Sequence, residues 1–283
     1  MSILAIQIQH DERFEDMLAR VANVGFRHVA VGFSPSQCFY SSDWEQQVLQ
    51  IERALEKNGL SCIQTHYNCH DLMMSAEVMD EETDRAILRC TEAAGKLGAR
   101  WNAYHLRTAI NENCSPKKSM EYAKAALTPI VEKAAQHNTG VLIENLPIFP
   151  GLFEYKFFSC NPEDLTDLYD YFHCEQMGIC WDFGHAHLMK FDEAMAIRSL
   201  GDRIKGTHVH SNAGYYDSHF LPTQGTIDWN AVMPALKEYY TGALTLELAY
   251  STVPDACIDS YLAHSYQCLQ YLDSIQAETE RIE

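Results

Sequence analysis

A single (β/α)8 barrel is the fold class that three features of the sequence predict. Short β-rich runs alternate with longer helical patterns along the whole chain, and eight strand–helix units can be counted. The length of 283 residues suits one such barrel. No Gly-x-Gly-x-x-Gly follows the first predicted strand, although that motif would favour the alternative of an open, doubly wound sheet. We therefore expect one domain over residues 1–283, with its site at the carboxyl ends of the strands.

The strands are predicted from short runs rich in apolar and β-branched residues. In order, they are Leu4–Ile8, His28–Phe33, Leu60–His66, Arg100–His105, Gly140–Asn145, Gly178–Asp182, Ile204–His210 and Ala243–Leu248. The helices are predicted from amphipathic spacing, and several have Pro at the start or Gly after the end. They are Arg13–Val24, Trp44–Lys57, Asp80–Leu97, Pro116–His137, Pro162–His173, Phe191–Leu200, Trp229–Tyr239 and Ala256–Ile275. Long loops follow the fifth strand (Leu146–Asn161) and the seventh (Ser211–Asp228).

The composition is that of a folded globular protein, with 47% hydrophobic and 21% charged residues. A net charge of −18 repels phosphate backbones and so disfavours nucleic acid as a partner. The ten Cys form no Cys-x-x-Cys pair and lie mostly in apolar runs, which indicates reduced thiols in a cytoplasmic protein. The first residues read as a strand instead of a signal peptide, and no apolar run approaches the ~20 residues of a membrane span. The sequence leaves the oligomeric state open, a homo-oligomer included.

Six consecutive predicted strands carry a metal-competent side chain at or near their carboxyl ends. These are His66, His105, Glu144, Asp182, His208 and Glu247. In a parallel barrel these ends lie on one face around one axis. Carboxylates inside runs as apolar as VLIEN and LTLEL are costly to bury, and a bound cation would offset that cost. Imidazole and carboxylate suit divalent zinc or manganese, with magnesium or cobalt as further options, so we expect a divalent metal site.

Four segments of the chain resemble the xylose-isomerase-like barrels, which include sugar phosphate isomerases/epimerases and the endonuclease IV group. The segments are VLIENLP (141–147), WDFGHAHL (181–188), IKGTHVHSNAGYYDSHFLPTQGTIDW (204–229) and LTLELAY (244–250). The resemblance implies a TIM barrel of the xylose isomerase type. In the isomerase and epimerase branch it implies one metal held by Glu144, Asp182, His208 and Glu247, with the two glutamates as the catalytic acid/base pair. In the endonuclease IV branch it implies three zinc ions, with His66, His105, His185, Asp217 and His219 as further ligands.

Neither branch is matched completely. Endonuclease IV proteins carry Pro-Gly-Ser after the fourth-strand histidine, where this chain has Leu106-Arg107-Thr108. Tagatose-type epimerases carry Arg six residues after the seventh-strand histidine, where this chain has Gly214.

Three functional hypotheses follow from these patterns. The first is a metal-dependent isomerase or epimerase of a small sugar or sugar-like polyhydroxy carbonyl compound, which moves a proton through an enediolate. Its catalytic residues would be Glu144 and Glu247, and His185 and His210 would bind substrate hydroxyls. The alternative is an endonuclease IV-like multi-zinc phosphoesterase acting on a small phosphodiester or nucleic acid. A non-catalytic metal-binding barrel is the third.

Overall fold

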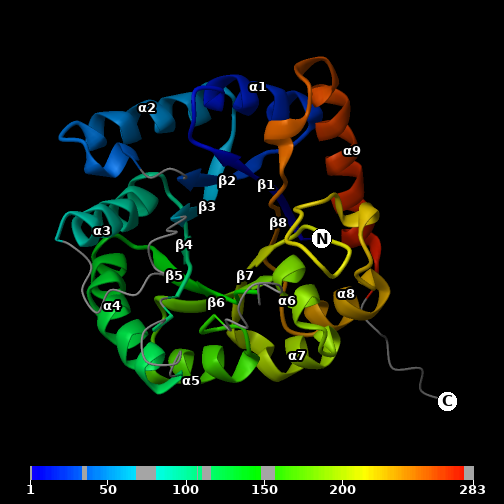
Figure 1. Ribbon diagram of the computed structural model, residues 1–283. Coiled ribbons are helices and arrows are strands. Elements are labelled where there is room, and N and C mark those ends of the chain that lie inside the picture. Colours follow the sequence, from blue (N-terminus) through cyan, green and yellow to red (C-terminus); the bar gives the residue numbers. More distant parts are fainter. Residues whose placement is uncertain are drawn as a thin grey trace.

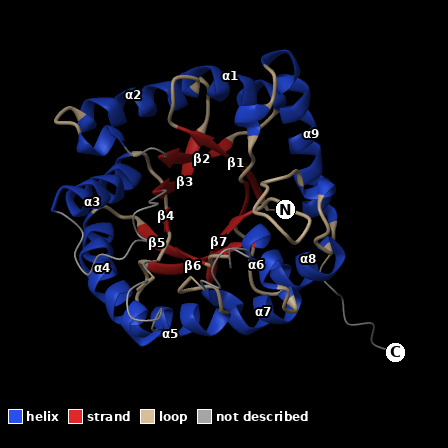
Figure 2. Ribbon diagram, viewed as in Figure 1, coloured by secondary structure: helices blue, strands red, loops and turns tan. Residues whose placement is uncertain are grey.

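The computed structural model is a ring of eight parallel strands surrounded by helices, which confirms the predicted fold class (Figures 1 and 2). It describes residues 2–33, 37–67, 81–106, 108–109, 116–147 and 157–276. The strands are β1 (Ile3–Gln9), β2 (His28–Phe33), β3 (Ser61–Tyr67), β4 (Trp101–Tyr104), β5 (Gly140–Glu144), β6 (Met177–Asp182), β7 (Ile204–His208) and β8 (Ala243–Leu246). They pair in the order β7-β6-β5-β4-β3-β2-β1-β8. A parallel bridge between Val209 and Leu246 joins the two outer strands and closes the ring.

The helices form the outer layer of the barrel (Figure 2). They are α1 (Phe14–Val24), α2 (Trp44–Lys57), α3 (Glu81–Lys96), α4 (Pro116–Gln136), α5 (Pro162–Phe172), α6 (Phe183–Met189), α7 (Glu193–Leu200), α8 (Trp229–Lys237) and α9 (Asp255–Ser274). Helix α1 shows the pattern that forms them: Phe14, Met17, Leu18 and Val21 recur at helical spacing and are buried against the strands. It ends before Gly25, whose φ of 127° favours glycine.

Two parts of the fold differ from the sequence-based expectation. Helix α6 follows β6 with no intervening loop and was not predicted, because seven residues are too short to show a helical period. Asp182 begins it by accepting a hydrogen bond from the backbone N–H of His185 at 2.6 Å. The last two residues predicted for the seventh and for the eighth strand lie beyond the strand ends. Residue 80, predicted as the start of the third helix, and most of the loop after β5 lie outside the described residues.

The interior of the barrel carries a small apolar layer beneath the predicted ligands. Ala103, Leu142 and Cys180 form a buried cluster that is separate from the main core, and Trp101 packs against it. Leu142 and Cys180 precede Glu144 and Asp182 by two residues, so they point to the same side of their strands. The charged ends of the strands therefore rest on an apolar floor that shields them from water on one side.

None of the described helices has both the length and the hydropathy needed to cross a bilayer.

Candidate metal centre

The carboxyl ends of β3 to β8 bring the six predicted side chains together inside the barrel mouth. His66, Glu144, Asp182 and His208 are almost completely buried. One ligand atom from each of His66, Glu144, His208 and Glu247 lies within 4.8 Å of the others. The register of β6 and β7 sets Asp182 beside His208, and their side chains approach to 3.9 Å. The sequence-predicted set thus converges as the topology required.

Glu144 lies at the centre of this cluster, with histidine nitrogens around both carboxylate oxygens. Its Oε1 lies 3.2 Å from His208 Nδ1 and 3.3 Å from His185 Nδ1. Its Oε2 lies 3.2 Å from His66 Nε2 and 3.3 Å from His105 Nε2. Burial alone would raise the pKa of Glu144, but positive charge on His208 and His105 outweighs it and holds the pKa well below its usual range. The carboxylate is therefore ionised.

Several atoms of this cluster have no hydrogen-bond partner among the described residues. They include both carboxylate oxygens of Glu144, Nδ1 of His66 and Nδ1 of His208. Buried polar atoms without partners are costly, and a cation that accepts their lone pairs removes the cost. Carboxylate oxygen and imidazole nitrogen are ligands for zinc or manganese. The residues present therefore fit a divalent metal ion.

A second cluster lies beside the first and combines residues of α6 and of the segment after β7. Ligand atoms of His185, His210, Asp217 and His219 lie within 4.8 Å of one another. Asp217 Oδ2 lies 3.3 Å from His185 Nε2 and 3.0 Å from His219 Nε2. His185, Asp217 and His219 are three of the five further ligands that the endonuclease IV resemblance implied, and His210 joins them here.

Backbone carbonyls fix the two imidazoles that face Asp217. His185 Nδ1 lies 2.8 Å from the carbonyl oxygen of Asn145, and His219 Nδ1 lies 3.0 Å from that of Glu247. Because a carbonyl only accepts, each Nδ1 carries the proton. Each Nε2 then faces a carboxylate and needs either a second proton or a cation. The second cluster can therefore hold positive charge in either form.

We expect the metal-free protein to lose stability as the pH rises from 6.5 to 9. Burial lowers the pKa of His219, but the hydrogen bond to Asp217 and the charge of Glu247 raise it from 6.5 to about 9. A raised pKa stabilises the fold below the unfolded value of 6.5, and this stabilisation is lost as the pH passes 9. The loss is at most about 3 kcal/mol. Urea unfolding with chelator present at several pH values measures it.

His219→Gln should make that pH profile less steep, because one of the imidazoles with a raised pKa is gone. A divalent ion at the second cluster should reverse the trend, since metal competes with protons for the same nitrogens. A wild-type profile that is flat between pH 6.5 and 9 would remove the assigned contact between His219 and Asp217.

His210, predicted to bind substrate, is completely buried in the structure. Its Nε2 lies 3.0 Å from Asp182 Oδ2, and its ring stacks on His219 with centroids 4.0 Å apart. A Cβ on Gly184 would collide with the His210 ring, so the glycine of the WDFGHAHL segment makes room for it. The contacts of His210 are thus with the two candidate metal clusters.

Three polar residues that the sequence patterns did not single out contact the predicted ligands. Asn145 clamps β5 to β6: its amide donates to the carbonyl of Asp182 at 2.8 Å and accepts from the N–H of Asp182 at 2.7 Å. Gln7 donates to Glu247 Oε1 at 2.7 Å, and the amide of Gln64 lies 2.6 Å from His208 Nε2. The feature of the sequence that could have revealed them is a polar residue at an inward-facing position in or next to an otherwise apolar strand.

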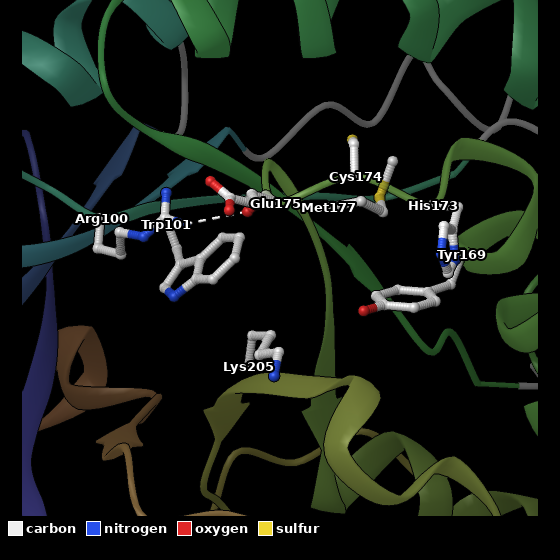
Figure 3. A pocket seen from close by; sticks show the side chains of 8 residues that line it. All are labelled: Arg100, Trp101, Tyr169, His173, Cys174, Glu175, Met177 and Lys205. Atoms are coloured by element: carbon white, nitrogen blue, oxygen red, sulfur yellow. Dashed lines mark hydrogen bonds between the residues drawn. The ribbon is translucent and has the colours of Figure 1, made fainter.

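A cavity of about 600 Å³ opens at the other ends of the strands (Figure 3). Its lining residues are Arg100, Trp101, Tyr169, His173, Cys174, Glu175, Met177 and Lys205. Within it, Arg100 donates to the carbonyl of Glu175 at 3.0 Å and lies over the ring of Trp101. None of the predicted site residues lines this cavity, so it is distinct from the metal clusters.

Comparison with known proteins places the chain in a family. A family model described as xylose isomerase-like TIM barrel matches residues 18–267. Uncharacterized protein MJ1311 of Methanocaldococcus jannaschii is 29% identical over 164 residues, or 56% of this chain, and the match spans about half of that relative (52%).

Two solved structures show the same fold. D-psicose 3-epimerase with D-tagatose from Clostridium cellulolyticum H10 has a TM-score of 0.75 at 14% identity, covering 98% of this chain and 100% of that one. The apo form of 3-keto-D-glucoside 4-epimerase, YcjR, from E. coli has a TM-score of 0.74 at 16% identity, covering 96% and 100%. The family match extends over most of the sequence, and the chain belongs to the xylose isomerase-like TIM barrel family.

Proposed function

We propose that the protein is a divalent-metal-dependent isomerase or epimerase of a small sugar or sugar-like polyhydroxy carbonyl compound. The observation that carries the proposal is the pair of glutamates on either side of His208. Glu144 Oε1 and Glu247 Oε2 lie 3.2 Å and 3.1 Å from His208 Nδ1. One carboxylate is the last residue of β5 and the other directly follows β8, so they approach a common centre from separate parts of the ring. Structural neighbours named as sugar epimerases support a carbohydrate substrate.

The two glutamates can carry out a proton transfer at carbon. Burial would raise the pKa of Glu247, but the charge of His208 and its contact with the carboxylate hold the pKa well below its usual range. Both carboxylates are therefore ionised and able to accept a proton. A divalent cation, when bound, polarises the substrate carbonyl and balances the charge that develops on its oxygen.

In the proposed reaction, one glutamate removes the proton from the carbon next to the carbonyl. The bonding electrons move to the carbonyl oxygen and give an enediolate of the substrate. The other glutamate takes up a proton from solvent and delivers it either to the opposite face of the same carbon or to the neighbouring carbon, while the first glutamate releases the proton that it removed to solvent. The first outcome is epimerisation and the second is isomerisation. His185 lies beside Glu144 and is proposed to bind a substrate hydroxyl. His210, whose ring lies next to that of His185, is proposed to assist it.

The proposal also covers the identity of the metal ion, the number of domains and the cellular compartment. Zinc or manganese is the proposed ion, and magnesium or cobalt would be held by the same oxygen and nitrogen ligands. The chain is proposed to act as one domain in the cytoplasm, because its cysteines lie mostly in apolar runs without paired spacing. A small carbohydrate-like molecule is the proposed partner.

A second candidate function, a multi-zinc phosphoesterase, is favoured by the second cluster. His185 and His219 both turn Nε2 toward Asp217, although a one-metal isomerase does not need that arrangement. Further ions there could clamp a phosphate and activate a water. The net charge of −18 disfavours duplex DNA and leaves a small phosphodiester as the substrate.

The two functions are separated by Asp217→Asn. For the isomerase we expect a mild loss of turnover, about tenfold or less, because Asp217 lies outside the Glu144–Glu247 pair. For the phosphoesterase we expect a loss of about 100-fold or more, because an ion that activates the reaction is released. The measurements are solvent deuterium exchange into a panel of ketohexoses, and hydrolysis of bis(p-nitrophenyl) phosphate.

A matched control for this substitution is Asp192→Asn. Asp192 accepts the N–H of Met195 at the start of α7 and lies outside both clusters. It should leave both assays unchanged. Phosphodiester hydrolysis by the wild type, without deuterium exchange into any sugar, would replace the isomerase with the second candidate.

A further inference from the structure

Two buried glutamines lie beside the proposed metal centre, and each contacts one ligand. Gln7 on β1 and Gln64 on β3 are 2% and 3% exposed. The amide of Gln7 donates to Glu247 Oε1 at 2.7 Å, and the amide nitrogen of Gln64 lies 2.6 Å from His208 Nε2. We propose that both are positioning residues. Gln7 determines which oxygen of Glu247 faces the metal, and Gln64 determines which nitrogen of His208 does. This inference rests on the metal site of the proposed function.

The space that the barrel interior leaves for the side chain of Gln64 indicates that its amide has a role at the proposed metal centre. A buried amide is costly to desolvate, and an apolar side chain would extend the apolar floor at less cost. Across the interior of the barrel, β7 instead carries Gly206 opposite Gln64. A Cβ on Gly206 would lie 3.2 Å from Gln64 Oε1 and would collide with Leu142. The glycine therefore leaves space for both side chains.

The contact of Gln64 bears directly on the proton of His208. His208 Nδ1 lies 3.1 Å from Glu247 Oε2 and 3.2 Å from Glu144 Oε1, so Nδ1 is the atom that would meet the metal. A ligating nitrogen needs its lone pair, so the imidazole proton must then be on Nε2. That proton requires an acceptor, and the side-chain oxygen of Gln64 can supply it.

An amide is suited to this position because it offers both a donor and an acceptor. The structure places this amide 2.6 Å from His208 Nε2, and an amide can present either its NH2 group or its oxygen to that nitrogen. A turn of the amide by 180° presents the oxygen and stabilises the tautomer with a free Nδ1. Gln64 thus accommodates His208 with and without a metal ion.

Gln7, unlike Gln64, needs only the donor group of its amide. Its partner is a carboxylate, so only a donor can satisfy it. By holding Glu247 Oε1 at 2.7 Å it leaves Oε2 directed at His208. Hence a carboxylate at position 64 can still accept from His208, whereas a carboxylate at position 7 would repel Glu247.

The test compares four variants of the full chain: Gln64→Met, Gln64→Glu, Gln7→Met and Gln7→Glu. Affinity for Mn²⁺ is measured by calorimetry after chelation, with no substrate present. We expect both Met variants to bind about 10- to 100-fold more weakly, the usual cost of losing a residue that orients a ligand. Gln64→Glu should stay close to wild type, and Gln7→Glu should bind at least as weakly as Gln7→Met.

The nitrogen of His208 that binds the ion, read from ¹⁵N chemical shifts of the Zn²⁺-loaded protein, is a second readout that a general loss of packing leaves unchanged. We expect Nδ1 bound to the ion and the proton on Nε2 in the wild type and in Gln64→Glu, and a mixture of the two arrangements in Gln64→Met. If Gln7→Glu does not fold, the comparison of Gln64→Met with Gln64→Glu still tests the inference. Wild-type affinity in Gln64→Met, or equal loss in Gln64→Glu and Gln64→Met, would overturn the inference.

The outcomes also separate this inference from the proposed function. A wild type that binds Mn²⁺, shows the predicted variant order and exchanges no sugar proton keeps the inference and removes the isomerase. A wild type that binds no divalent ion overturns both.

Discussion

We expect Glu247→Gln to slow the exchange of the substrate's carbon-bound proton by about 100-fold or more, the usual effect of removing a general base. Glutamine keeps the shape of the side chain but loses the charge and the ability to take up a proton. One amide oxygen remains for the metal or for the N–H of Gln7, so we expect the variant to fold. The assay is solvent deuterium exchange into the substrate carbon, followed by NMR.

The control for this result is Glu193→Gln. Glu193 is a largely buried glutamate paired with His187 at 2.8 Å, and it lies outside both clusters. Its exchange rate should equal that of the wild type. A wild-type rate in Glu247→Gln would take Glu247 out of the acid/base pair and end the proposed mechanism.

We expect chelation of the proposed divalent ion to abolish turnover and to lower the melting temperature. The ion offsets the buried charge of Glu144 and its unpartnered neighbours, so it binds the folded chain and not the unfolded one. At a free metal concentration of 1,000 times Kd the stabilisation is about 4 kcal/mol. For a chain of this size we expect a shift on the order of 10 °C. Thermal unfolding before and after addition of Zn²⁺ or Mn²⁺ measures it.

Metal analysis of the same samples gives the number of ions per chain. One tightly held ion agrees with the isomerase, and two or three agree with the phosphoesterase. Asp217→Asn should reduce the count only in the second case, because Asp217 belongs to the second cluster. A melting temperature that does not change on chelation would contradict a metal at either cluster.

The sequence by itself determined the barrel and the convergence of the main candidate ligands. Alternating strand and helix patterns leave few arrangements, and a parallel ring collects the carboxyl ends of all strands on one face. Placing Glu144, Asp182 and His208 at strand ends was therefore enough to predict that they meet. The resemblance to known barrels added His185, Asp217 and His219, which lie in the second cluster.

Only the tertiary structure decided which atoms face one another. Gln7 meets Glu247 across 240 positions of the sequence, and Gln64 meets His208 across 144. Such contacts depend on strand register, on ring closure and on side-chain rotamers, none of which appears in a local pattern of residues. The short helix α6 escaped prediction for a related reason, since its cap on Asp182 and its packing against His210, and not helical periodicity, place it.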